Sequence, residues 1–326
     1  MKLITRLFAR DRLQHVANYL MLIRWPNLLV TVFTMVMVRY YLIRPLLMSE
    51  GYEMPIPLWV FVMLVLSVLL MMSGGYVIND YFDVRIDQVN RVEKVVLGSR
   101  VPVRHAIPLH ATLTSLGVLT GLLVSLYVGT AKLVFVHLIV GLMLWLYSAR
   151  YKRRPFWGNL VVAVLSGLVV LVVWLFEFMA MANQGIFIMN RAEFGWVNNA
   201  VFFFALFAFV LSLIREIIKD MADVEGDKRY GCLTLPVVAG MTTVKWIVTS
   251  ITLATMLALL GVQIYLWLGS FYKLTAYYFI VVQIMLALVI QRNHAARKQD
   301  DYHFTSQLLR IAMVAGVLSL QIYHIE

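Results

Sequence analysis

Two short acidic segments share one spacing of aspartates. The first reads NDYFDVRID over residues 79–87, and the second reads REIIKDMADVEGD over residues 215–227. Each contains the pattern D-x-x-D-x-x-x-D, and the aspartates involved are Asp80, Asp83, Asp87, Asp220, Asp223 and Asp227. On an α-helix, positions i, i+3 and i+7 lie on one face over two turns. Each segment therefore predicts a stripe of three carboxylates on one face of a helix.

Three carboxylates on one face repel one another, so such a stripe indicates a compensating cation. Mg²⁺ is held in proteins by carboxylate oxygens, while phosphate oxygens and water complete its coordination shell. Two facing stripes would hold about two or three Mg²⁺ ions with a diphosphate bridged between them. We predict all six aspartates as metal ligands and assign the catalytic roles to Asp80, Asp83, Asp220 and Asp223.

Basic residues near the two stripes could bind the phosphate oxygens. A diphosphate needs Lys and Arg besides metal, because its charge must be balanced as it departs. Each of these residues also fits the ordinary excess of Lys and Arg in cytoplasmic loops, so both interpretations stay open. The residues are Arg91, Lys94, Arg150, Lys152, Arg153, Arg215 and Lys219.

The elements that must position these residues are membrane helices. The chain has 326 residues, of which 62% are hydrophobic and 14% charged, and its mean hydropathy is +0.82. These values exclude an ordinary soluble domain and predict an all-α polytopic membrane protein. A span needs about 20 mainly apolar residues. Nine windows meet this condition, namely 17–40, 56–79, 106–128, 131–148, 158–181, 197–219, 243–269, 274–291 and 305–323.

The basic residues follow the predicted membrane topology. The net charge is +11, but most Lys and Arg fall before the first window or in the even-numbered loops, which does not indicate nucleic acid as a partner. By the positive-inside rule, the N-terminus and both acidic segments are cytoplasmic, and the C-terminus is outside. We predict a cell-membrane protein with one domain, 1–326, and motif loops at about 80–105 and 220–242. No pattern indicates an oligomeric state.

Three other interpretations fit part of this pattern. The acids could cap helices or form salt bridges at the membrane surface, without any ligand. A cation-coupled transporter also uses acids, but it places them on broken helices near the bilayer midplane. A catalytically silent paralogue could keep the same residues. A further acid, Glu177, lies within the fifth window and is either a buried anchor or a residue that positions a substrate.

The two acidic segments resemble the paired aspartate motifs of the UbiA superfamily of intramembrane prenyltransferases. The longer stretches are NDYFDVRIDQVNR and REIIKDMADVEGDKRYGCLTLPVVAG, and YSARYKRRPFWGN and RWPN are also similar to family segments. The resemblance implies nine helices around a central cavity and Mg²⁺-dependent transfer of an isoprenyl group from an allylic diphosphate to a lipophilic acceptor. It adds Asn79 to the first Mg²⁺–diphosphate motif and implies that Lys152 lies near the diphosphate.

The second motif resembles that of geranylgeranylglycerol-phosphate geranylgeranyltransferases most. This implies geranylgeranylglyceryl phosphate as the acceptor and an ether as the new bond, with an aromatic acceptor of quinone or pigment biosynthesis as the alternative. One segment departs from the family. The proline-rich stretch after the first motif is replaced by NRVEKVVLGSRVP, and this change leaves the metal-binding motifs untouched.

Overall fold

A computed structural model of the protein describes residues 14–90, 95–184, 194–269 and 273–325, apart from the side chains of residues 85, 87–90 and 323–325. Within these ranges every regular element is helical, and the one extended pairing is an isolated bridge between Leu97 and Val101. The helices are α2 (Trp25–Met37), η1 (Val38–Ile43), α3 (Arg44–Ser49), α4 (Leu58–Asn90), η3 (Val103–His105), α5 (Ala106–Tyr127), η4 (Ala131–Leu133), α6 (Val134–Ala149), η5 (Tyr151–Arg153), α7 (Trp157–Asn183), α9 (Gly195–Ala222), α10 (Val224–Arg229), α11 (Leu235–Ala239), α12 (Met241–Leu268), α13 (Lys273–Ala295) and α14 (Gln299–Ile325).

Nine of the helical stretches in the described residues are long and apolar enough to cross a membrane, as predicted. The first begins later than the predicted 17–40 and covers Trp25–Ser49. Arg24 has a left-handed backbone (φ 55°), and Pro26 follows in the first turn of α2. Proline fits the first turn of a helix because the missing N–H has no partner there anyway. The predicted window 17–40 therefore included a change in chain direction at Arg24 that hydropathy does not reveal.

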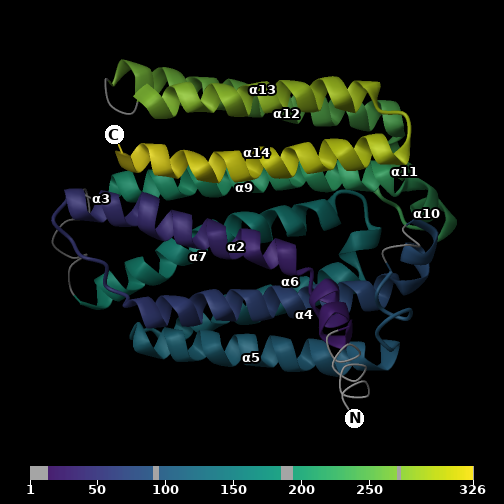
Figure 1. The fold of residues 1–326 in the computed structure, drawn as a ribbon, viewed down its shortest axis with the longest axis horizontal. Coiled ribbons are helices and arrows are strands. Elements are labelled where there is room, and N and C mark those ends of the chain that lie inside the picture. Colours follow the sequence, from purple (N-terminus) through teal and green to yellow (C-terminus); the bar gives the residue numbers. More distant parts are fainter. Residues whose placement is uncertain (1–13, 91–94, 185–193, 270–272, 326) are drawn as a thin grey trace, which may run out of the picture.

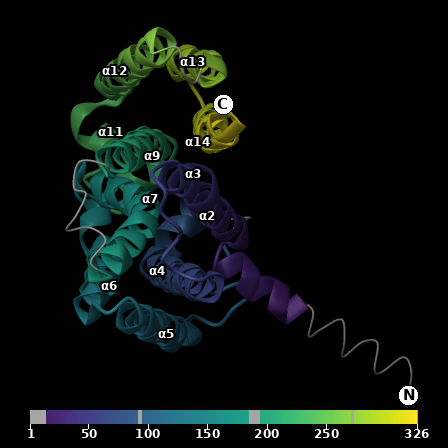
Figure 2. The ribbon, with the colours of Figure 1, turned by 90° about the vertical axis from the view of Figure 1, so that its left-hand side faces the viewer.

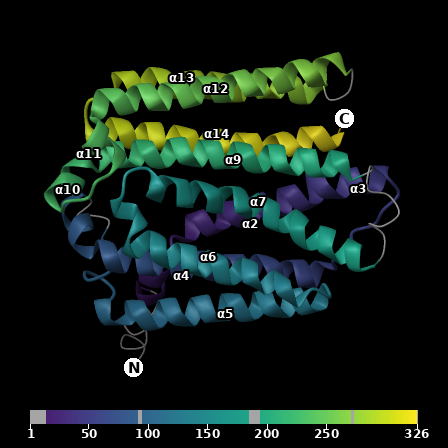
Figure 3. The same cartoon turned by 180° about the vertical axis from the view of Figure 1, so that it is seen from behind.

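The long helices lie roughly along one direction, with α2 crossing the others obliquely (Figure 1). Helices α4 and α5 form a close pair, as do α7 and α9, and the α12–α13 hairpin lies outside α9 and α14 (Figures 1 and 3). Short helices α10 and α11 lie at one end of the bundle, which we call the motif end, and the C-terminus lies at the other. Viewed along the helices, the elements surround a central region (Figure 2).

Two apolar clusters hold the bundle together. One joins η1 and α3 to α4, α7 and the beginning of α9, with Met35, Leu42 and Phe176 fully buried. The other joins α9 to α12, α13 and α14 around Ile214 and Leu286. Helix α9 belongs to both clusters, so the second acidic segment at its end is carried by a helix that packs on both sides of the bundle.

A buried ion pair fixes the first span. Arg39 Nε donates to Glu177 Oε1 at 2.7 Å, and the two side chains are 2% and 1% exposed. Arg39 also donates to the Ile56 carbonyl, while Glu177 Oε2 accepts from the Ile56 N–H at 3.2 Å. The Arg39 guanidinium lies 4.5 Å from the Phe61 ring centre. Glu177 is therefore a buried anchor between α7, η1 and the chain before α4.

Candidate active site

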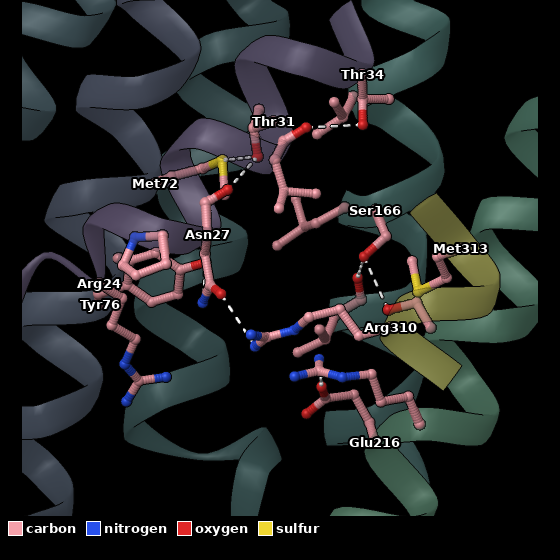
Figure 4. A pocket seen from close by; sticks show the side chains of 18 of the residues that line it. Arg24, Asn27, Thr31, Thr34, Met72, Tyr76, Ser166, Glu216, Arg310 and Met313 are labelled. Carbon is pink, nitrogen blue, oxygen red and sulfur yellow. Dashed lines mark hydrogen bonds and ion pairs between the residues drawn. The ribbon is translucent and has the colours of Figure 1, made fainter. Parts of the chain in front are cut away.

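A cavity of about 790 Å³ opens between α2, α4, α7, α9 and α14. Each helix contributes one face, as the spacing of lining residues on α9 illustrates with Phe204, Ala208, Ser212, Arg215 and Lys219. These positions recur every three or four residues, as one face of an α-helix requires. The charged side chains lie toward the motif end, and the remainder is lined mostly by apolar side chains, together with Thr31, Thr34 and Ser166 (Figure 4). The cavity therefore suits a molecule with a polar head and an apolar chain.

The first acidic segment lies in the last three turns of α4, and basic side chains hold two of its aspartates. Asp80 lines the cavity and accepts a hydrogen bond from Arg24 Nη2 at 2.6 Å. Asp83 is 3% exposed and forms an ion pair with Lys152, whose Nζ also lies 3.4 Å from Asn79 Oδ1. The helix continues to Asn90, so the i, i+3 spacing places Asp80 and Asp83 on neighbouring turns of one face.

Unusual backbone geometry occurs near both basic residues that contact α4, namely Arg24 and Lys152. Arg24 and Phe156 are the non-glycine residues with positive φ in the described chain, and Phe156 (φ 67°) directly precedes α7. Such conformations cost about 1–3 kcal/mol and cluster at functional sites. A Cβ on Gly158 would lie 3.0 Å from the Lys152 Cα. Glycine there lets the first turn of α7 approach η5, which carries Lys152.

The second acidic segment spans a break between two helices. Helix α9 ends at Ala222, Asp223 caps it, and α10 begins at Val224. Asp220 accepts from Asn159 Nδ2 at 2.7 Å, and Asp227 accepts from Thr234 Oγ1 at 2.9 Å. The expectation of one continuous helical stripe was therefore wrong for this segment. Asp223 leaves the helical region there (φ −96°, ψ 6°), and the chain turns toward α4, against which α10 packs.

The two segments are close enough to influence each other electrostatically. Burial raises the pKa of Asp227 to about 6, while the Thr234 hydrogen bond lowers it and the Asp223 carboxylate raises it. Smaller effects on the same pKa come from Lys152, which lowers it, and Asp83, which raises it. A buried carboxyl with a raised pKa ionises more readily beside added positive charge. Lys152 and Asp83 are therefore close enough to Asp227 to affect its pKa.

The donor set fits Mg²⁺ by its chemistry. Asp80, Asp83 and Asp227 offer hard carboxylate oxygens from two elements in contact, and Asn79 adds an amide oxygen. In the described part of the chain, no three His, Cys, Asp or Glu residues are grouped closely enough to hold a metal ion. The basic side chains of Arg24 and Lys152 compensate the first two carboxylates instead.

Of the residues predicted to bind the diphosphate, Asn79, Arg150, Lys152, Arg153, Arg215 and Lys219 lie in the described residues. Four of them converge on this region, whereas Arg150 and Arg153 are exposed and do not line the cavity. Asn79, Arg215 and Lys219 line the cavity, and Lys152 reaches it through Asp83 and Asn79. Arg91 and Lys94 lie outside the described residues. Asp87 belongs to α4, but its side chain is also outside them.

Several charged residues of the cavity were not predicted as ligands, although Glu216 lies in the second acidic segment. Glu216 is 6% exposed and lines the cavity, where it pairs with Lys219 Nζ at 2.7 Å and with Arg215 Nη1 at 3.0 Å. Arg24 and Arg310 also line it. Arg24 belongs to the RWPN segment that resembles the family, whereas the sequence signal of Arg310 is that ionisable residues within membrane helices are rare and usually functional.

Fold and cavity define a polytopic membrane protein that takes up a molecule with an anionic head and an apolar chain. Residues 36–313 match the model of the UbiA prenyltransferase family. The chain belongs to this family and is a prenyltransferase.

Curated relatives align with about two thirds or more of the chain. The digeranylgeranylglyceryl phosphate synthase of Methanobrevibacter smithii is 26% identical over 307 residues, which cover 93% of this chain and 96% of the relative. The enzyme of the same name from Methanoregula boonei is 34% identical over 211 residues, or 64% of this chain and 67% of the relative. The chain therefore covers the greater part of both relatives.

Solved structures show the same fold. A digeranylgeranylglyceryl phosphate synthase structure has a TM-score of 0.59 at 23% identity and covers 95% of this chain and 99% of its own. A UbiA homolog from Archaeoglobus fulgidus, bound to GPP and Mg²⁺, has a TM-score of 0.55 at 18% identity, with 93% and 99% covered. The nine-helix arrangement of this chain is thus the UbiA fold.

Proposed function

We propose that this protein transfers a geranylgeranyl group from geranylgeranyl diphosphate to a hydroxyl of geranylgeranylglyceryl phosphate, with Mg²⁺ as cofactor. The observation that carries the proposal is that both acidic segments contribute to one end of the cavity, with Asn79 and Asp80 from the first and Arg215, Glu216 and Lys219 from the second. Such a cavity accepts a diphosphate at one end and an isoprenyl chain along its length. The names of the curated relatives, digeranylgeranylglyceryl phosphate synthase, support the product.

We assign the metal to the six aspartates of the two segments and the diphosphate to the predicted basic residues and Asn79. The solved UbiA homolog from Archaeoglobus fulgidus, which is bound to GPP and Mg²⁺, supports a diphosphate and Mg²⁺ as ligands. Arg24 and Lys152 now compensate Asp80 and Asp83, and a bound diphosphate would draw these basic groups to its own oxygens. When bound, Mg²⁺ supplies neutralisation of the diphosphate leaving group.

The reaction breaks the allylic carbon–oxygen bond to diphosphate and forms an ether bond, while the acceptor hydroxyl gives up its proton. The apolar walls of the cavity exclude water, which would otherwise capture the allylic cation. Arg215, Lys219 and the α4 side chains hold the head groups at the polar end. Apolar side chains from α7, α9 and α14 leave room for the chains.

We place the motif end on the cytoplasmic side of the cell membrane and the C-terminus outside. Basic side chains gather at the motif end, among them Lys152, Arg153, Lys228 and Arg229. The positive-inside rule supports this orientation.

A transfer assay tests the function. Purified protein in lipid vesicles would receive geranylgeranyl diphosphate, Mg²⁺ and an equimolar mixture of geranylgeranylglyceryl phosphate, 4-hydroxybenzoate and 1,4-dihydroxy-2-naphthoate. We expect one dominant product with the mass of the doubly geranylgeranylated glycerol phosphate. Asp83→Asn removes a buried carboxylate of the site and should lower the rate about 100-fold or more.

Asp300→Asn is the matched control, because Asp300 is an exposed residue in the first turn of α14, away from the cavity lining. Its rate should equal that of the unmodified protein. Preferred prenylation of either aromatic acid would overturn the proposed acceptor. No diphosphate release with any of the three acceptors, or full activity in Asp83→Asn, would overturn the proposed reaction.

A further inference from the structure

The described cavity lining carries more positive than negative charge. Its acidic side chains are Asp80 and Glu216, and its basic ones are Arg24, Arg100, Arg215, Lys219 and Arg310. Arg24 pairs with Asp80, whereas Arg215 and Lys219 share the single carboxylate of Glu216. On the α14 side, the lining adds a further basic group, Arg310, which forms an ion pair with neither of these acids.

Among these basic groups, Arg310 lies within a membrane span and forms no ion pair with either acid of the lining. It lies near the middle of α14, roughly 16 Å along the helix axis from Gln299 at 1.5 Å per residue. Its Nη2 donates to Asn27 Oδ1 at 3.1 Å (Figure 4), and among the described residues no carboxylate lies within ion-pair distance of it. A charge inside a membrane helix is costly and marks function. The Arg310 guanidinium faces the cavity with most of its donors available.

Arg215 supplies a second unfilled donor next to it. Its Nη1 bonds Glu216, but its buried Nε has no hydrogen-bond partner among the described residues. A buried donor without a partner is unfavourable and indicates an absent ligand or water. Arg215 and Arg310 face one cavity from adjacent helices, and each guanidinium can present two parallel N–H groups to a phosphate.

We propose that Arg310, Arg215 and Asn27 form a second anion site, the Arg310 subsite, which binds the phosphate of the acceptor. This inference rests on the proposed function, because it assigns the head group of that acceptor. The site would select phosphorylated amphiphiles over uncharged ones, and it needs no metal, since all its donors are side-chain N–H groups.

The position of the subsite matches the acceptor better than the donor. Arg24, which directly precedes α2, donates to Asp80, and Asn27 in the first turn of α2 accepts from Arg310. The Asp80 site and the Arg310 subsite therefore both lie beside the beginning of α2. In a glycerol phosphate, the phosphate and the neighbouring hydroxyl stand on adjacent carbons. A phosphate in the Arg310 subsite therefore brings that hydroxyl toward the donor held at Asp80.

The walls beyond the subsite accommodate the acceptor chain. Met313, Val317 and Leu320 continue the cavity-facing side of α14 for the next three turns, away from the motif end. A lipid whose phosphate binds Arg310 can lay its isoprenyl chain along these residues. The acceptor phosphate would lie close to the donor diphosphate, so its negative charge needs its own neutralisation. Arg215 and Arg310 supply this positive charge.

Kinetics with a matched acceptor pair test the subsite. Geranylgeranylglyceryl phosphate and its dephosphorylated analogue, geranylgeranylglycerol, would be compared in unmodified protein and in Arg310→Met, which keeps the chain length but removes the charge. We expect KM for the phosphorylated acceptor to rise about 10- to 100-fold, in line with the loss of a charge-assisted contact. The KM for geranylgeranyl diphosphate and the rate with the uncharged acceptor should change less than about twofold.

A binding experiment without turnover gives the second readout. In EDTA, the unmodified protein should still bind geranylgeranylglyceryl phosphate, as measured by intrinsic tryptophan fluorescence, and Arg310→Met should bind it at least about tenfold more weakly. Arg292→Met is the control, because Arg292 lies on α13 outside the cavity lining, over the Phe304 ring. It should match the unmodified protein in both experiments.

The outcomes separate the subsite from the proposed function. Equal losses with both acceptors, a raised KM for the diphosphate, or no change in Arg310→Met would overturn the subsite. If Arg310→Met does not fold, Asn27→Asp provides the alternative test of the subsite. A carboxylate beside Arg310 should abolish the preference for the phosphorylated acceptor. If the unmodified protein binds that lipid in EDTA but forms no product from it, the proposed function fails while the subsite stands.

Discussion

At the scale of single residues, Arg39 and Glu177 show how a charged pair is kept inside the bundle. Neither side chain lines the cavity, and both are almost fully buried. Breaking a buried pair by removing one charge is costly, because the other charge is left without a partner. Glu177→Gln should therefore lower the free energy of unfolding by about 3–5 kcal/mol, seen as a lower thermal midpoint in detergent.

The double variant Arg39→Met/Glu177→Leu is the matched comparison. It removes both charges and fills similar volume, so its thermal midpoint should lie well above that of Glu177→Gln. A single variant as stable as the unmodified protein would show that the pair contributes nothing beyond packing.

Residue types and spacing were enough to find the acidic segments, but not their partners. Asp80, Asp83 and Asp220 stand out because the same spacing occurs twice in an acid-poor chain. Arg24 and Asn159, which hold Asp80 and Asp220, come from other helices. Such contacts depend on how the helices pack, and no local pattern in the sequence records them. The contact between Arg310 and Asn27 was not predicted for the same reason.

At the scale of elements, the junction of η5 and α7 controls the position of Lys152. Gly158→Ala would place a methyl group 3.0 Å from the Lys152 Cα and 3.2 Å from the Tyr151 carbonyl oxygen. Backbone atoms cannot move away as a flexible side chain can, so η5 must shift. Because small displacements of positioning groups are costly to catalysis, we expect the transfer rate to fall about 10-fold or more.

Gly261→Ala provides the control for this substitution. Gly261 lies within α12, and nothing lies within 4 Å of an added Cβ. Alanine there should leave the rate unchanged and raise stability by up to about 1 kcal/mol, because glycine is a poor helix former. Full activity in Gly158→Ala would mean that the junction does not set the position of Lys152.

Hydropathy predicted the membrane helices well, since each span is long and almost uncharged. Hydropathy did not predict the helix ends that depend on backbone dihedral angles. The left-handed Arg24 moved the beginning of the first span, and the turn at Asp223 divided the second acidic segment between α9 and α10. Neither is visible to a count of apolar residues, because both depend on local dihedral angles.

At the scale of the whole molecule, the cavity depends on helices that are far apart in the sequence. Helices α2 and α14 lie near opposite ends of the chain, yet both line it, and Asn27 and Arg310 contact across it. A sequence predicts the number of spans and the charge of their ends, but a cavity depends on which faces meet. The resemblance of the motifs implied a central cavity, whereas its lining residues required the structure.

The orientation of the whole bundle in the membrane gives the last prediction. Glu50, just after α3, and Arg154, just after η5, are exposed residues at opposite ends of the bundle. The single cysteine, Cys232, is buried and would be replaced by alanine. In this background, a membrane-impermeant maleimide added to intact cells should label Glu50→Cys but not Arg154→Cys. Permeabilised cells should show labelling of both, which verifies that each thiol is reactive. Because basic loops stay on the cytoplasmic side, the reverse pattern in intact cells would place the motif end outside and contradict the proposed orientation.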